Sequence, residues 1–175
     1  MRTESDEVTS YKCRTCQVTF DELPLCFGAD APETWDALPD NDRARNGRLT
    51  DDVCEIDGQH FFIRGRLEIP IRSSDRVFAW LVWSSLSEVN FRRVQELWST
   101  VGREREDPYF GWLNSALPYS PSTLNLKVLV HTRPVGERPW VELEATDHPL
   151  SVEQRDGITW ERVHDIVHRL GRDGA

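Results

Sequence analysis

One alternating segment, residues 60–72, constrains the fold of this chain more than any other feature. Apolar residues and glycine take every second position, and the positions between them are mostly charged. The apolar set is Phe61, Ile63, Gly65, Leu67, Ile69 and Ile71. This period of two predicts a half-buried strand of an antiparallel sheet, because successive side chains on a strand point to opposite faces. Residues 73–76 then predict a turn, and residues 77–83 predict a returning central strand that is apolar on both faces.

Helix signals follow the predicted hairpin and recur near the C-terminus. Ser87 and Thr159 each precede a stripe of apolar residues with three- and four-residue steps, so they predict the capped starts of two main helices. Ser151 and Gln154 have the spacing of a capping box, in which the two side chains satisfy backbone N–H groups of the first turn. A third helix start is therefore expected at Ser151.

The order of these elements predicts the fold class. Two further strands are expected at residues 124–131 and 140–145, and residues 102–123, with three prolines and two glycines, predict an aromatic-rich loop. Hairpins separated by helices, without strand–helix alternation, indicate the α+β class. We therefore predict an antiparallel sheet of about four to six strands packed with two main helices, plus an N-terminal cysteine-knuckle arm.

This fold is expected to form a single domain over residues 11–170. The arm occupies residues 11–58 and includes two short helices, and the sheet and main helices occupy residues 59–170. Residues 1–10 are expected to be disordered and residues 171–175 to be frayed, since terminal segments order only when packing holds them.

The charge balance limits the classes of partner. The chain has 30 Asp and Glu residues against 21 Lys and Arg residues, a formal net charge of -9, so its field repels phosphate backbones and anionic membranes. The first ten residues lack the apolar segment of a secretory signal, and no run approaches the roughly 18 apolar residues of a membrane span. We expect a cytoplasmic protein whose partner is neither a membrane nor a nucleic acid.

Four cysteines fall in the first third of the chain. In a reducing cytoplasm they are expected to bind metal, to act in redox chemistry or to stay buried, rather than to form structural disulfides. Cys13 and Cys16 have the C-x-x-C spacing of a zinc knuckle, in which two thiolates from one turn bind the same ion. A structural zinc needs four ligands, so Cys54 with either Cys26 or His60 completes the predicted site. A redox-active Cys13–Cys16 pair and inert thiols are the alternatives.

Two sets of side chains are candidates for a binding surface. Arg64 and Arg66 share a strand face with Glu68 and are candidates for an anion pocket, the alternative being a solvated face with ion pairs. The predicted loop carries aromatic residues, which are favoured at protein interfaces, the alternative being a roof over the sheet. These aromatic residues are Tyr109, Phe110, Trp112 and Tyr119.

A cluster of carboxylates beside a histidine raises an enzymatic alternative. Glu142 and Glu144 share a strand face, and Asp147 and His148 follow just after the strand. Carboxylates with an imidazole can ligate a metal ion or transfer protons, which is the basis of a small metal-dependent hydrolase. Solvation of the strand face is the simpler interpretation, and His148 then counts with the binding surface.

Several strings occur in order and without large gaps over residues 11–170. They are Tyr11–Cys16, Leu23–Pro32, His60–Pro70, Trp83–Ser87, Tyr109–Trp112, Thr123–Lys127, Thr146–Leu150 and Glu153–Arg155. Together they resemble the bacterial family of domain of unknown function 2199. The resemblance implies a single-domain cytoplasmic bacterial protein without an established activity. It also implies that Cys13, Cys16 and Cys54 belong to the family pattern, which favours them as zinc ligands with His60 or water as the fourth.

These features together predict a noncatalytic protein-interaction module with a structural zinc. Its acidic surface and aromatic residues are expected to engage a basic protein, such as a toxin that the cell neutralises, because electrostatic complementarity speeds capture. The alternative is the metal-dependent hydrolase that uses the carboxylates and histidine of residues 142–148.

Overall fold

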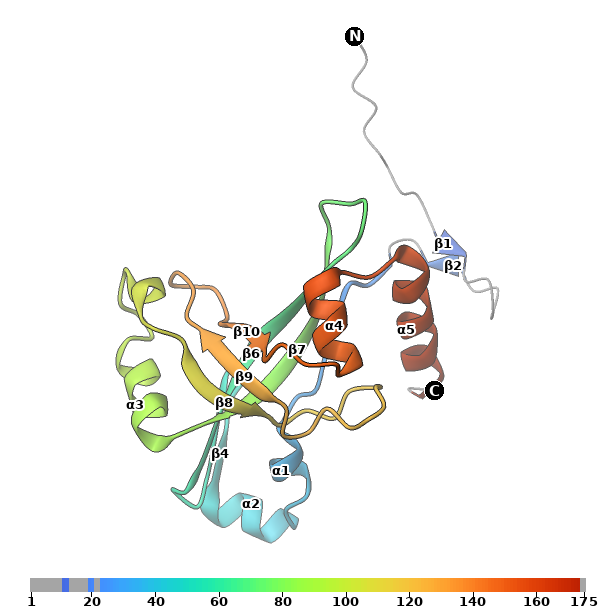
Figure 1. Ribbon diagram of the computed structural model, residues 1–175. Helices are drawn as coiled ribbons and strands as arrows, with labels where there is room; N and C mark the ends of the chain where they lie inside the picture. The colour runs from blue at the N-terminus through green and yellow to red at the C-terminus, as the bar shows by residue number, and fades with distance from the viewer. Residues whose placement is uncertain (1–10, 13–18, 21–22, 174–175) are drawn as a thin grey trace.

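A closed barrel of five strands is the centre of the structure, a computed structural model that describes residues 11–12, 19–20 and 23–173 (Figure 1). The barrel strands are β6 (His60–Pro70), β7 (Val77–Leu86), β8 (Tyr109–Leu113), β9 (Lys127–His131) and β10 (Trp140–Leu143). Neighbouring strands pair antiparallel from β6 through to β10. The barrel then closes where β10 pairs with β6 in parallel, through Trp140 and Arg66.

The alternating apolar set of β6 fills the barrel interior. Leu67 lies opposite Trp80 of β7, and Ile69 lies opposite Phe78, and all four side chains are almost completely buried. The shorter strands add their own alternate residues to the same cluster, namely Tyr109, Leu113, Val128, Val130, Val141 and Leu143. The predicted strand is confirmed, but it is half-buried only over residues 66–70, because Phe62 and Arg64 on the other face are buried as well. Apolar burial is the main stabilising contribution to folding.

The seam between β6 and β10 is short, and a helix side chain completes it. The Arg66 N–H donates a hydrogen bond to the Pro139 carbonyl at 2.8 Å. Beyond this point α4 (Pro149–Asp156) approaches the open edge of β10. The Gln154 side-chain amide donates to the Val141 carbonyl and accepts from the Leu143 N–H, both at 2.8 Å. One side chain therefore satisfies backbone groups that a further strand residue would otherwise pair.

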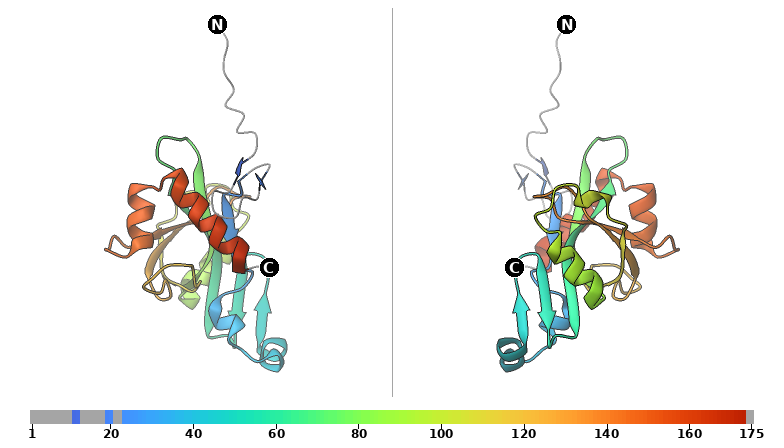
Figure 2. Two further views of the ribbon diagram at one scale, coloured as in Figure 1. Left: turned by 90° about the vertical axis from the view of Figure 1, so that its right-hand side faces the viewer. Right: turned by 90° about the vertical axis from the view of Figure 1, so that its left-hand side faces the viewer.

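Three further strands extend the sheet beyond the barrel. β3 (Cys26–Gly28) pairs in parallel with β7, β5 (Val53–Ile56) pairs with β6, and β4 (Gly47–Leu49) pairs with β5. α1 (Glu33–Asp36) and α2 (Asp40–Asn46) lie with β4 at the lower end of the molecule in Figures 1 and 2. A second apolar cluster lies in this region and consists of Cys54, Ile56, Phe62 and Trp83 with Trp35, Leu38 and Leu49.

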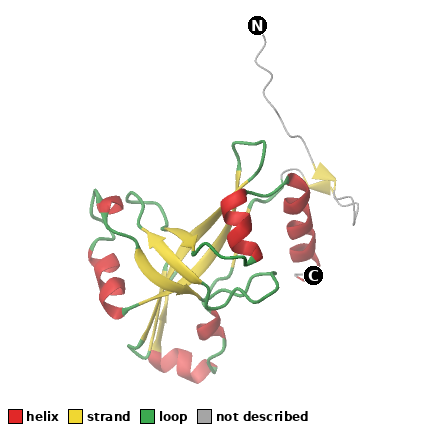
Figure 3. Ribbon diagram, in the orientation of Figure 1, coloured by secondary structure: helices red, strands yellow, loops and turns green. Residues whose placement is uncertain are grey.

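Helices lie on several sides of the barrel (Figure 3). α3 (Glu88–Glu96) begins after Ser87, whose side chain accepts from the Asn90 N–H, and α5 (Trp160–Asp173) begins after Thr159, which accepts from the Arg162 N–H. Both predicted caps are confirmed. The predicted capping box is wrong, because α4 begins before Ser151.

The remaining short elements are β1 (Tyr11–Lys12), β2 (Thr19–Phe20) and the 3-10 helix η1 (Arg103–Arg105). In the part of the chain that the structure describes, no helix has the length and apolar character to cross a membrane.

The predicted architecture, an antiparallel sheet packed with two main helices, is wrong. The described residues form a closed five-stranded barrel with three extra strands and four helices of seven residues or more. One cause is β8, which lies within residues 102–123, where prolines and glycines predict a loop. β8 joins β7 to β9, so the barrel closes only when this strand is present. The other cause is the expected arm, which instead contributes β3, β4 and β5 to the main sheet.

Candidate functional site

The outer wall of β8, β9 and β10 carries an ordered set of exposed side chains. We name it the aromatic–acidic face, and its members are Phe110, Trp112, Lys127, Leu129, Glu142 and Glu144. Phe110, Leu129 and Glu142 form one row across the three strands, and Trp112 and Lys127 begin the next row. The face therefore has an aromatic column on β8 and a carboxylate column along β10. Two strand spacings, about 10 Å, separate these columns.

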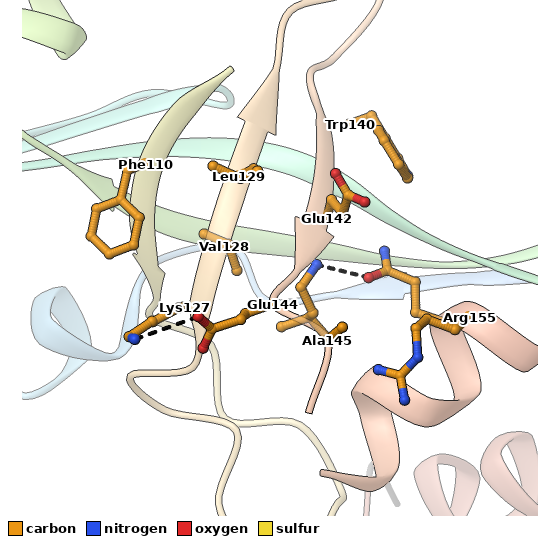
Figure 4. A pocket seen from close by; sticks show the side chains of 11 residues that line it. Phe110, Lys127, Val128, Leu129, Trp140, Glu142, Glu144, Ala145 and Arg155 are labelled. Carbon is orange, nitrogen blue, oxygen red and sulfur yellow. Dashed lines mark hydrogen bonds and ion pairs between the residues drawn. The ribbon is translucent and has the colours of Figure 1, made fainter. Parts of the chain in front are cut away.

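Two hollows lie in this face, and Figure 4 shows the larger of them. The larger has a volume of about 470 Å³, and Phe110, Leu129 and Trp140 are among the residues that line it. The smaller has a volume of about 200 Å³ and is lined in part by Trp112 and Thr146. Both hollows share one ion pair as a common boundary, that of Lys127 Nζ with Glu144 Oε1 at 3.5 Å.

The apolar side chains of the face are unusually exposed for the wall of a barrel. Phe110 is 48% exposed, Trp112 is 42% exposed and Leu129 is 39% exposed. The Phe110 and Trp112 rings meet edge to face, with their centroids 5.3 Å apart. The other large apolar side chains of similar or greater exposure in the described residues are valines, namely Val77, Val89, Val101 and Val135. Contiguous exposed apolar surface, unlike single exposed residues, marks an interaction site.

The polar side chains of the face are held in weak surface pairs. Glu142 accepts from the His131 ring at 2.8 Å, and that ring stacks on Trp140 with 4.7 Å between centroids. The Lys127–Glu144 pair is half exposed on both sides. Exposed pairs of this kind contribute little free energy, about 0–1 kcal/mol, because water competes for both charges. A charged group of a ligand can therefore replace one partner at small cost.

Three residues predicted for the binding surface point elsewhere. The Tyr119 hydroxyl donates to Glu153 at 2.6 Å, and Tyr109 and His148 are held in a similar way. Tyr109 is buried, and its hydroxyl donates to Glu106 at 3.1 Å; burial, followed by this hydrogen bond, raises the pKa of Tyr109 to about 12. His148 caps α4, with Nδ1 accepting from the Leu150 N–H at 3.2 Å and Nε2 donating to the Pro121 carbonyl at 3.0 Å. All three side chains are thus engaged in holding the fold.

The two arginines predicted to bind an anion are each matched by a carboxylate. Arg64 is 9% exposed, lies over the Trp83 ring and has Asp30 at 3.6 Å. Arg66 Nε donates to Glu68 at 3.1 Å. Arg133 also binds Glu68 through both guanidinium ends, at 2.9 and 2.8 Å, and this hydrogen bonding is the main cause of the lowered pKa of the Glu68 carboxyl. Ion pairs hold both arginines, as the alternative predicts, but Arg64 is buried rather than solvated.

The predicted zinc ligands fall only partly within the described residues. Cys13 and Cys16 lie outside them, so the zinc site stays a prediction. Cys54 is completely buried in the second apolar cluster, and burial, followed by the charge of Asp36, raises its pKa to about 12. His60 is exposed at the start of β6, and Cys26 is exposed on β3.

Of the residues predicted for a hydrolase, Glu142 and Glu144 line the larger hollow together, whereas His148 does not line it. Glu142 pairs with His131, Glu144 pairs with Lys127, and His148 is turned to the backbone of residues 121 and 150. Among the side chains that the structure describes, no group of three or more His, Cys, Asp or Glu residues is placed to hold a metal ion.

Sequence reasoning missed two residues that line the larger hollow, Leu129 and Trp140. Leu129 lies in a continuous apolar run, which does not reveal which residues face solvent. A signal was available nevertheless, because Leu129 alternates with Val128 and Val130 and shares its register with Lys127, so it falls on the polar side of β9. Trp140 begins β10 and points outward two residues before Glu142.

The fold and the face define a small β-barrel protein with an exposed aromatic and acidic wall. The chain belongs to the family of uncharacterised proteins conserved in bacteria, domain of unknown function 2199, which it matches over residues 12–158. This range contains the whole barrel, α4 and every residue of the aromatic–acidic face, and it ends before α5. Comparison with curated proteins and with solved structures gave no match.

Proposed function

We propose that this protein is a noncatalytic protein-binding domain that docks a basic partner on the aromatic–acidic face. The observation that carries the proposal is the contiguous exposure of Phe110, Trp112 and Leu129 along hollows in a barrel wall. Large aromatic side chains that are already held in place lose little conformational entropy on binding, which is why Trp and Tyr dominate the energetics of protein interfaces.

Charge supports a basic partner. The net charge of -9 attracts a basic protein from a distance and raises its rate of encounter. At the face itself, Glu142 and Glu144 form the side opposite the aromatic column, and Lys127 and Arg155 line the same hollow beside them. A partner with basic groups beside apolar ones therefore complements both columns.

A hydrolase is not our proposal for this face. The two carboxylates line the larger hollow without His148, which uses both ring nitrogens to cap α4 and to bind the backbone of residue 121. Acid–base chemistry requires groups that reach one reacting atom, and these groups point to different neighbours.

Affinity capture from native lysate tests the proposal. The wild-type protein is compared with Trp112→Ala, and Val89→Ala serves as a control because Val89 is a 78% exposed apolar residue on α3. We expect basic proteins to be retained by wild type and Val89→Ala, lost with Trp112→Ala, and released as salt increases. Capture of the same proteins by wild type, Trp112→Ala and Val89→Ala would mean that the face does not bind the partner.

We further propose that the Cys13–Cys16 pair binds a structural zinc that supports the N-terminal segment. The two short strands on either side of this pair support the proposal, because Tyr11 pairs with Phe20 and Lys12 pairs with Thr19 in antiparallel register. A C-x-x-C sequence that falls between two paired strands is typical of a zinc knuckle, and zinc supplies folding free energy to segments with little apolar surface.

A further inference from the structure

We infer that the partner segment bound by the aromatic–acidic face is a basic amphipathic helix. The inference rests on the proposed function, since it names the element that this face would recognise. Protein segments are bound in a small number of ways, and strand addition, proline-rich docking and helix docking are the three that suit a sheet wall with exposed aromatic rings.

Strand addition needs a strand with an unpaired edge, and the three strands of this face offer little of one. β8 pairs with β7 and β9, and β9 pairs with β8 and β10. β10 pairs with β9 on one side, and on the other side it meets β6 and the Gln154 side chain. β9 is paired on both sides, and β8 pairs with β7 at Trp112 and Leu113, so most backbone groups of the wall are occupied and recognition uses mainly its side chains.

Proline-rich segments insert proline rings into slots between aromatic side chains. Phe110 and Trp112 leave no such slot, because their rings are in edge-to-face contact at 5.3 Å between centroids. They form one continuous apolar ridge, and a ridge beside a hollow suits the row of side chains along one face of a helix.

The dimensions of the face match a helix that lies over β9. The two columns stand about 10 Å apart, which is close to the diameter of a helix with its side chains. Residues two apart on a strand are separated by about 6.7 Å, and residues four apart on a helix rise by about 6.0 Å. Apolar residues at positions i and i+4 would contact Phe110 and Trp112, and Lys or Arg residues on the opposite flank would reach Glu142 and Glu144.

The Lys127–Glu144 pair indicates how such a helix is accommodated. This pair separates the two hollows and has a loose N–O distance of 3.5 Å with both side chains about half exposed. A basic residue of the helix replaces Lys127 at Glu144, so one exposed pair is exchanged for another. The two hollows then join into one groove along the face.

Photo-crosslinking identifies the bound segment. Phe110→p-benzoylphenylalanine is introduced into the full chain, and the same residue is placed at Val89 on α3 as a control. After irradiation in lysate of the native bacterium, the crosslinked peptide is sequenced. We expect crosslinks specific to position 110 on a segment with Lys or Arg residues and an i, i+4 apolar stripe. Capture of a protein without that pattern does not support the inference.

The mapped segment is then synthesised and titrated against purified protein. We expect its helical circular dichroism to increase on binding and its affinity to fall about fivefold for Glu142→Gln and for Glu144→Gln at low salt, with little change for Glu161→Gln on α5. Trp112→Ala is expected to weaken binding about tenfold or more. Thermal unfolding of each variant confirms that it is folded.

The outcomes separate this inference from the proposed function. A crosslinked segment that is acidic, proline-rich or without helix gain overturns the helix and leaves protein binding at the face intact. A crosslink to a second copy of the chain overturns the basic partner and gives a self-association site instead. Crosslinking at position 110 that does not exceed the Val89 control overturns the proposed function itself.

Discussion

Gly65 of β6 and Val141 of β10 lie against each other across the seam where the barrel closes. A Cβ atom at position 65 would be 2.6 Å from Val141 Cγ2 and 2.9 Å from the Pro139 oxygen. The valine methyl could move, but the Pro139 backbone is fixed by its hydrogen bond from the Arg66 N–H. Closure of the barrel therefore depends on a residue without a side chain at this position.

Gly65→Ala is expected to lower the free energy of unfolding by about 3 kcal/mol, because the added methyl group overpacks the seam. Urea denaturation of wild type and variant measures the loss. Gly58→Ala is the matched control, because a Cβ atom at Gly58 would have no heavy atom within 4 Å. Gly58 has a positive φ of 62°, so this variant should lose about 1–2 kcal/mol of stability through backbone strain alone. Equal losses of unfolding free energy in the two variants would mean that a methyl group at position 65 does not overpack the seam.

Gln154→Ala is expected to lower stability by about 1–3 kcal/mol, because it leaves the Leu143 N–H and the Val141 carbonyl without their partner. Amide hydrogen exchange gives the more specific result, since the Leu143 amide should lose protection while the amides of β7 keep theirs. Gln59→Ala, at an exposed position between β5 and β6, should change neither quantity. Unchanged exchange at Leu143 would show that Gln154 does not complete β10.

Sequence reasoning located the barrel strands β6, β7, β9 and β10 and missed β3, β4, β5 and β8. β6 and β7 were predictable because ten register pairs join them and their apolar residues repeat over many positions. β3, β4 and β5 have three or four residues each, too few to show a period, and their existence depends on partners distant in the chain. Gly65 simply occupies one position of the alternation, so its contact with Val141 is not visible before the barrel is known.

Of the residues on the candidate face, those of β10 were predicted to lie on a strand, and those of β8 were not. Phe110 and Trp112 were recognised as aromatic residues, but in a presumed loop, because nearby prolines and glycines outweighed the five-residue alternation of β8. That alternation places Tyr109 inside the barrel and its neighbour Phe110 outside. The carboxylates Glu142 and Glu144 were predicted to share a strand face, yet their position opposite the aromatic column follows from cross-strand register, which the sequence does not specify.

Glu68 makes stability depend on acid pH. Its pKa is lowered chiefly by the Arg133 hydrogen bonds, so the folded state binds a proton less readily than the unfolded chain. The contribution is therefore fully present above the ordinary Glu pKa of about 4.3 and is lost as pH falls through the lower folded pKa. Glu68→Gln should cost about 1–3 kcal/mol at neutral pH and flatten the fall in stability below about pH 5.

Denaturant unfolding at a series of pH values measures this effect. Glu161→Gln, an exposed carboxylate on α5, is the control and should reproduce the wild-type pH profile. A Glu68→Gln profile parallel to that of wild type would mean that the Arg133 pair does not govern the acid response.

Metal analysis of cysteine variants tests the proposed zinc. Wild-type protein purified without oxygen should contain about one zinc ion per chain, and Cys13→Ser should lose it together with part of its thermal stability, since a structural zinc stabilises only the folded segment that binds it. Cys54→Ala tests the third predicted ligand: Cys54 is completely buried beside Phe62 and Trp83, so a variant that keeps its zinc should lose stability through packing alone. Zinc lost from both variants would instead make Cys54 a ligand, and wild-type protein without metal would overturn the zinc site.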